Sequence, residues 1–121
     1  MSQMTLLEDA LLQIIQKYPT YMRPPYFSSN ELVLQTMGEL AYHVITADID
    51  TLDWANDSEG GIQTAVQNFR DGVARGGTIE LSHDVHHWTA NCLVQAMIDE
   101  VKGRGLRGEL SLRKKELWRQ C

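Results

Sequence analysis

Apolar residues recur every three or four positions in four stretches of the chain, which is the pattern of helices with one buried face. They predict helices over residues 5–18, 28–47, 62–76 and 82–102. A capping box, in which a Ser or Thr is followed three residues later by Glu, opens each of the first two helices. Short links between helices of this length favour antiparallel neighbours.

The segments outside these helices add little regular structure. Residues 19–27 hold all three prolines and form an aromatic loop, which is either a recognition surface or a cap on one end of the bundle. Residues 78–81 are too short and isolated to predict a strand. Residues 111–119 predict a short amphipathic basic helix. The expected fold is all-α: a compact bundle of four main helices plus a short basic C-terminal helix.

Length and composition favour one domain in a reducing compartment. The 121 residues are 43% hydrophobic, so we expect one α-helical domain over residues 1–121, with 102–121 as its basic C-terminal helix or tail. The two cysteines are far apart and do not form a disulfide framework. No stretch looks like a signal peptide or a membrane span, which predicts a cytoplasmic protein that does not bind membranes.

Charge is divided unevenly along the chain. Residues 1–101 carry a net charge of −10 and residues 102–121 carry +5. An acidic body disfavours nucleic acid, except through the basic tail. Residues 48–59 hold five acids and no base. The leading functional prediction is a small acidic, non-enzymatic interaction protein, an inhibitor or adaptor, without a cofactor. It would bind a basic protein surface through Asp48, Asp50, Asp53, Trp54, Asp57 and Glu59. A homodimer is compatible with the exposed faces of the predicted tail helix and of the aromatic loop.

Three of the four histidines fall within residues 83–87. His83 and His87 continue the apolar stripe of the fourth predicted helix, four residues apart, and so share its inner face. His43 lies at the edge of the stripe of the second helix. The alternative prediction is therefore a metal-binding helical bundle, or a metal-dependent hydrolase, with Zn or Ni held by His43, His83 and His87. The other interpretation is that these are buried, neutral structural histidines.

Two families share parts of this histidine pattern. A histidine on the second helix followed by His-x-x-x-His, here His43, His83 and His87, is similar to DinB-like four-helix metal-binding proteins. That resemblance implies a metal site inside the bundle, although this chain is about one helix shorter. The pair His83-Asp84, with His43 before it and Asp99 after it, resembles HD-type phosphohydrolases.

Overall fold

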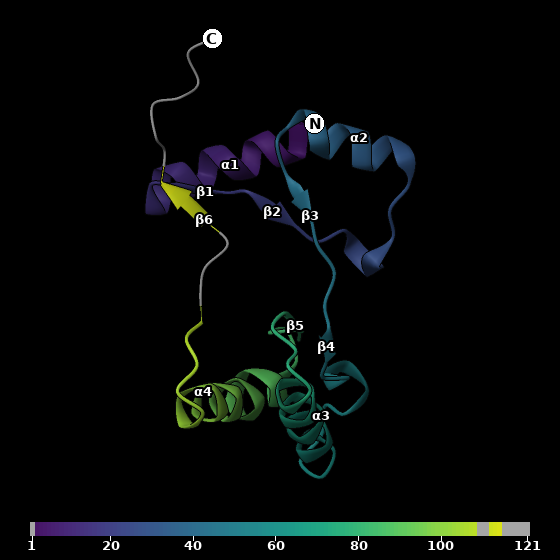
Figure 1. Ribbon diagram of the computed structural model, residues 1–121, viewed down its shortest axis with the longest axis vertical. Helices are drawn as coiled ribbons and strands as arrows, with labels where there is room; N and C mark the ends of the chain where they lie inside the picture. Colours follow the sequence, from purple (N-terminus) through teal and green to yellow (C-terminus); the bar gives the residue numbers. More distant parts are fainter. Residues whose placement is uncertain (1, 109–111, 115–121) are drawn as a thin grey trace. The chain divides into compact units, whose positions relative to one another are not determined.

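The computed structural model describes residues 2–108 and 112–114, and Figure 1 shows their helices and strands. These residues divide into two compact units. Unit 1 takes the described residues of Met1–Thr46 and Glu109–Cys121, and unit 2 is Ala47–Gly108. The single domain over residues 1–121 stays a prediction, because two compact units can belong to one folding domain.

Unit 1 combines two helices with two pairs of short strands. β2 and β3 are parallel, and Tyr21 is paired with His43. β1 and β6 are antiparallel, and Lys17 is paired with Lys114. The bounds of these elements are α1 (Ser2–Ile15), β1 (Lys17–Pro19), β2 (Tyr21–Met22), a 3-10 turn (Pro25–Phe27), α2 (Glu31–Glu39), β3 (His43–Val44) and β6 (Leu112–Lys114).

The second predicted helix is shorter than the sequence indicates. Its N-cap is Asn30, whose side chain accepts the Val33 N–H at 2.9 Å. The helix ends at Glu39, and Ala41 then adopts the left-handed conformation with φ of 60°. His43 therefore lies on a strand, and its placement on a helix was wrong.

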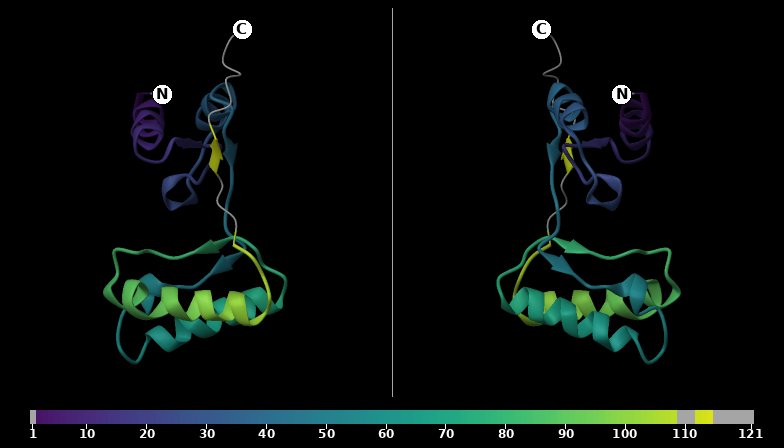
Figure 2. Two further views of the ribbon diagram at one scale, coloured as in Figure 1. Left: turned by 90° about the vertical axis from the view of Figure 1, so that its left-hand side faces the viewer. Right: turned by 90° about the vertical axis from the view of Figure 1, so that its right-hand side faces the viewer.

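Unit 2 places two helices on one side of a parallel strand pair, as Figure 2 shows. Ile49 and Asp50 of β4 (Ile49–Asp50) are paired with Glu80 and Leu81 of β5 (Glu80–Leu81). The remaining elements are a 3-10 turn (Asp53–Ala55), α3 (Ile62–Ala74), a π-helical segment (Thr89–Leu93) and α4 (Val94–Gly103).

The core of unit 2 confirms the predicted stripe of the third helix. Ile62, Val66 and Phe69 are buried. Gly72 lets α3 approach β4, because a Cβ built there would lie 2.6 Å from Cγ2 of Ile49. Leu93 completes the cluster from the π-helical segment.

The fourth helix begins later than predicted and its inward face is different. The chain becomes helical at His87, and the wide π turn over Thr89–Leu93 changes the register. Thr89 and Leu93 are fully buried, whereas Ala90 is exposed. The prediction that His83 and His87 continue an inward-facing apolar stripe of this helix was therefore wrong.

The all-α prediction was wrong because the strands are too short to show an alternating pattern. Each strand of the parallel pairs has two residues, and its partner lies about 20 to 30 positions away along the chain. Of the predicted basic C-terminal helix, residues 112–114 form β6, and the rest lies outside the described residues. Within residues 2–108 and 112–114, no helix has the length and apolar character needed to cross a membrane.

Candidate functional site

The candidate site lies where β4 and β5 end. Because the two strands are parallel, their carboxyl ends meet at the same edge. Asp53 comes three residues after β4, and His83 comes two residues after β5. The pairing of the strands thus brings together two side chains that are 30 residues apart in the sequence.

A strained turn directs Asp53 into unit 2. Leu52 is in the left-handed conformation, with φ of 52°, which is costly for a residue with a branched side chain. Polar side chains hold it there. The Leu52 N–H donates to Oδ1 of Asp50 at 2.9 Å, and its carbonyl accepts Nδ2 of Asn56 at 2.8 Å.

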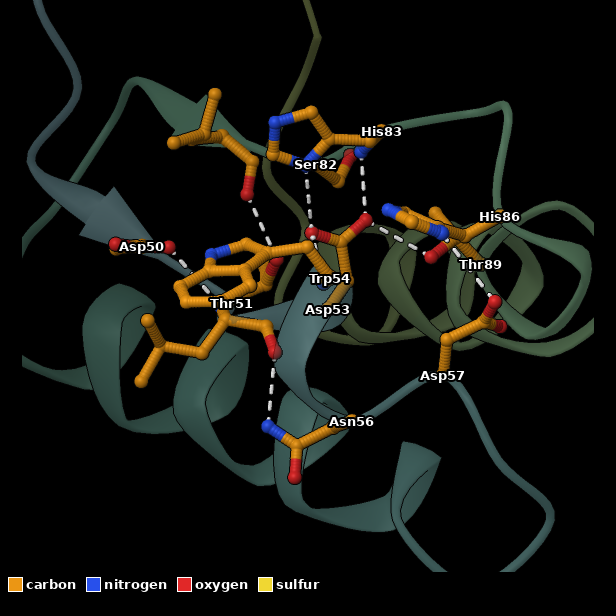
Figure 3. Close-up of polar contacts among 12 residues, drawn as sticks. Asp50, Thr51, Asp53, Trp54, Asn56, Asp57, Ser82, His83, His86 and Thr89 are labelled. Atoms are coloured by element: carbon orange, nitrogen blue, oxygen red, sulfur yellow. Dashed lines mark hydrogen bonds and ion pairs between the residues drawn. The ribbon is translucent and has the colours of Figure 1, made fainter. Parts of the chain in front are cut away.

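The Asp53 carboxylate is fully buried and well bonded (Figure 3). Its Oδ1 lies 2.8 Å from Nδ1 of His83 and accepts the Trp54 N–H at 2.9 Å. Its Oδ2 accepts the His83 N–H at 2.6 Å and the Thr89 hydroxyl at 2.8 Å. A buried charge is tolerated only when donors compensate for lost hydration, and these groups supply that compensation.

The donors also keep Asp53 ionised. Burial alone opposes ionisation and raises the pKa. The hydrogen bonds from the His83 ring and N–H and from the Thr89 hydroxyl outweigh burial, so the pKa of Asp53 lies below its ordinary value. The site therefore holds a fixed negative charge at neutral pH.

That carboxylate fixes the orientation of the His83 imidazole. An ionised carboxylate only accepts hydrogen bonds, so Nδ1 of His83 carries the proton that faces Asp53. The opposite nitrogen, Nε2, is then free to exchange a proton with a bound molecule. The His83 side chain is 40% exposed, whereas Asp53 is not exposed at all. A buried carboxylate behind an accessible imidazole is an arrangement suited to general acid–base catalysis.

The acidic segment predicted to bind a partner forms its hydrogen bonds mainly within unit 2. Asp48 accepts the N–H groups of Ile79 and Thr78, and these bonds lower its pKa. Asp57 accepts the Trp88 N–H at 2.9 Å. Trp54 exposes 58% of its surface, and Glu59 is also exposed.

The three-histidine metal site stays a prediction, because its ligands belong to two separate units. His43 belongs to unit 1, where its ring lies 5.0 Å from that of Tyr21. His83 precedes the helix, whereas His87 is exposed on its first turn, so they do not share a helical face. Within the described part of the chain, no group of three or more His, Cys, Asp or Glu side chains could hold a metal ion. The helical geometry behind the DinB-like and HD-type resemblances is absent from the described residues.

Asp53 and His83 were both predicted to be site residues, but their pairing was not predicted. Thr89, which is buried against Asp53, was not predicted either. The available signal was positional. Residues 49–51 and 79–81 each hold two β-branched or apolar side chains around one acidic residue, and Asp53 and His83 follow two residues later. Side chains at the carboxyl ends of neighbouring parallel strands converge.

The chain is similar to polysaccharide deacetylases. No protein-family model matches it. A chitin deacetylase from Pestalotiopsis sp is 56% identical over 105 residues, covering 87% of this chain and 35% of the relative. A probable peptidoglycan-N-acetylglucosamine deacetylase from Arthroderma benhamiae is 54% identical over 107 residues, covering 88% and 24%. The solved chitin deacetylase of Colletotrichum lindemuthianum has 36% identity and a TM-score of 0.72, covering 88% of this chain and 49% of that one.

These similarities correct the functional prediction. The relatives are enzymes, so the prediction of a non-enzymatic inhibitor or adaptor was wrong. The match to a deacetylase structure also contradicts the all-α fold. The metal-dependent hydrolase, given as the alternative, is closer, because chitin deacetylases are typically metal-dependent. The chain spans between a quarter and a half of the length of these relatives.

Proposed function

We propose that this chain carries the proton-transfer part of a polysaccharide deacetylase that acts on N-acetylglucosamine polymers such as chitin. The observation that carries the proposal is the Asp53–His83 pair, with a buried carboxylate behind a half-exposed imidazole. A chitin deacetylase that is 56% identical to this chain over 87% of its length supports the choice of substrate. Because the chain spans only part of each relative, the activity of the whole protein is included in the proposal.

The reaction is hydrolysis of an acetamide. A water oxygen bonds to the acetyl carbon, the carbon–nitrogen bond breaks, and the nitrogen must gain a proton to leave as an amine. Nε2 of His83 donates that proton, the attacking water loses its two protons to solvent, and the products are acetate and a free amino sugar. The Asp53 charge stabilises the protonated ring before the transfer and keeps Nδ1 as the inner nitrogen.

Trp54 supplies a surface for the sugar. It follows Asp53 directly, and its backbone N–H donates to Oδ1 of Asp53. The residue is 58% exposed. A large aromatic side chain with a polar edge offers contact area at small cost in conformational entropy. We propose that a pyranose ring lies against this indole while its acetamide reaches His83.

A divalent metal would supply polarisation of the acetyl carbonyl and of the attacking water. The described residues do not fit such a group, because no three or more of their His, Cys, Asp and Glu side chains form a set of ligands. The role given to His83 is therefore limited to the proton at Nε2 and involves no metal step.

The test is a chimera that supplies the rest of the relative's domain. The part of the Colletotrichum chitin deacetylase that aligns with this chain is replaced by this chain, and acetate release from chitin oligosaccharides is measured. We expect activity that falls roughly 100- to 10,000-fold in His83→Ala, the usual contribution of general acid–base catalysis.

The matched control is His87→Ala, which removes an exposed histidine from the neighbouring helical turn. Its activity should stay within about twofold of that of the chimera, because His87 does not contact Asp53 in the site described. Circular dichroism verifies that each variant is folded. A folded chimera whose acetate release is the same with and without the His83 imidazole would refute the proposed function.

A further inference from the structure

A second carboxylate–imidazole pair lies beside the first. Oδ2 of Asp57 is 3.2 Å from Nδ1 of His86 (Figure 3). Oδ1 of Asp57 accepts the backbone N–H of Trp88 at 2.9 Å. Asp53 makes the same kind of double contact, with the ring and the N–H of His83. Two carboxylates of the segment 53–57 thus hold the two ends of the segment 83–88.

The residues between these anchors form a turn that carries His83. The His86 N–H donates to the His83 carbonyl at 3.1 Å, which closes residues 83–86 into a four-residue turn. The intervening residues, Asp84 and Val85, are exposed. Contacts at the ends of the turn must therefore fix its orientation.

The two imidazole rings also touch. The ring centroids of His83 and His86 are 5.9 Å apart, and the planes meet at 75°, edge to face. In this geometry the His86 ring limits rotation of the His83 ring about its bond to Cβ. His86 is itself held by Asp57, so its ring has a fixed direction.

We propose that Asp57 and His86 are positioning residues that aim Nε2 of His83 at the acetamide nitrogen. The pair is partly exposed, with 28% of the Asp57 side chain and 30% of the His86 side chain accessible, so it adds little to the stability of the fold. Its effect is on geometry, because a proton donor displaced by about 1 Å loses much of its rate advantage. Only this catalytic consequence rests on the proposed function.

The direct test uses the full 121-residue chain and no substrate. Long-range proton–nitrogen NMR spectra at alkaline pH report which ring nitrogen of His83 carries the proton, and His83→Gln assigns the signals. We expect a single state with the proton on Nδ1. In His86→Ala and Asp57→Asn, Asp53 still keeps the proton on Nδ1, but the His83 ring signals should shift or broaden because the ring turns more freely.

Two further variants separate positioning from general damage. His86→Asn keeps an N–H donor close to the position of the His86 Nδ1, where it can still reach Asp57. It should therefore retain more of the wild-type His83 spectrum than His86→Ala. Asp84→Asn removes the same charge as Asp57→Asn from an exposed position in the turn, so it should leave the spectrum unchanged. A His83 spectrum that is insensitive to both His86→Ala and Asp57→Asn would overturn the inference. An equal response to Asp84→Asn would also overturn it.

The active chimera tests the catalytic consequence. His86→Ala should lower kcat roughly tenfold with little change in KM, and His86→Asn should recover part of the loss. Altered His83 spectra in a chimera without His83-dependent activity would remove the proposed function and leave the positioning role standing. The opposite combination, His83-dependent activity with unaltered spectra and kcat in His86→Ala, would remove the positioning role alone.

Discussion

Replacing Asp53 by asparagine tests whether the buried carboxylate holds unit 2 together. The substitution keeps the size of the side chain and removes its charge. Each carboxylate oxygen accepts one backbone N–H, from Trp54 at Oδ1 and from His83 at Oδ2. Whichever way the amide turns, its NH2 group faces one of these donors. One buried N–H is then left without an acceptor.

The expected cost follows from these contacts. A buried, unsatisfied polar group costs about 1–3 kcal/mol, and a hydrogen bond to a charged group contributes about 1.5–3 kcal/mol. Since the site relaxes in part, we expect Asp53→Asn to lower the free energy of unfolding by about 2–4 kcal/mol. Asp50→Asn is the matched control, because Asp50 is exposed and accepts a single N–H, from Leu52. Its loss should stay below about 1 kcal/mol.

Urea unfolding followed by tryptophan fluorescence measures both losses. A Trp118→Phe background leaves Trp54 and Trp88, which both lie in unit 2. The pH dependence gives a second check. Because the folded-state pKa of Asp53 is lowered, its stabilisation is present at neutral pH and is lost as the pH falls through that pKa. The gap in the free energy of unfolding between wild type and Asp53→Asn should therefore narrow in acid. Equal urea midpoints at neutral pH, or a gap that widens in acid, would contradict the described site.

Thr89→Val should lower the free energy of unfolding, measured in urea, by about 1–2 kcal/mol, because it removes a buried hydroxyl donor to Asp53. Thr89→Ser should recover part of this loss. Gly72→Ala should lower the free energy of unfolding by about 1–3 kcal/mol, since its methyl group would lie 2.6 Å from Cγ2 of Ile49, whereas Gly103→Ala has open space around it and should change stability little. The metal content of protein purified without a histidine tag, measured by elemental analysis, should not change in His83→Ala, because His83 belongs to no group of ligands among the described residues. A stoichiometric metal that is lost with that substitution would contradict this expectation and make His83 a metal ligand.

The third helix could be predicted because its information is local. Ile62, Val66 and Phe69 show a regular spacing, and glycines follow the last turn. The strands could not be predicted in the same way. Each parallel strand is two residues long, too short to show an alternating pattern, and the paired residues of β4 and β5 are 31 positions apart.

The start of the fourth helix shows why the histidines were misplaced. Ser82 has the character of an N-cap, but its hydroxyl donates to Glu80 at 3.3 Å. The Trp88 N–H at the start of the helix is instead bound by Asp57, 31 residues earlier. The π turn then changes which residues face inward. His83 was predicted to be a metal ligand, and its partner Asp53 could be found only with the fold.

Capping of the fourth helix from so far away has a consequence for the order of folding. A helix of this length is marginal in water until its ends and apolar face are satisfied. Its first turn acquires the Asp57 contact only after the loop of some 30 residues has closed. The same closure delivers Asp53 to His83. The proton donor is thus created late, by the long-range step that completes unit 2. A partly folded chain would contain the helix residues but no oriented imidazole.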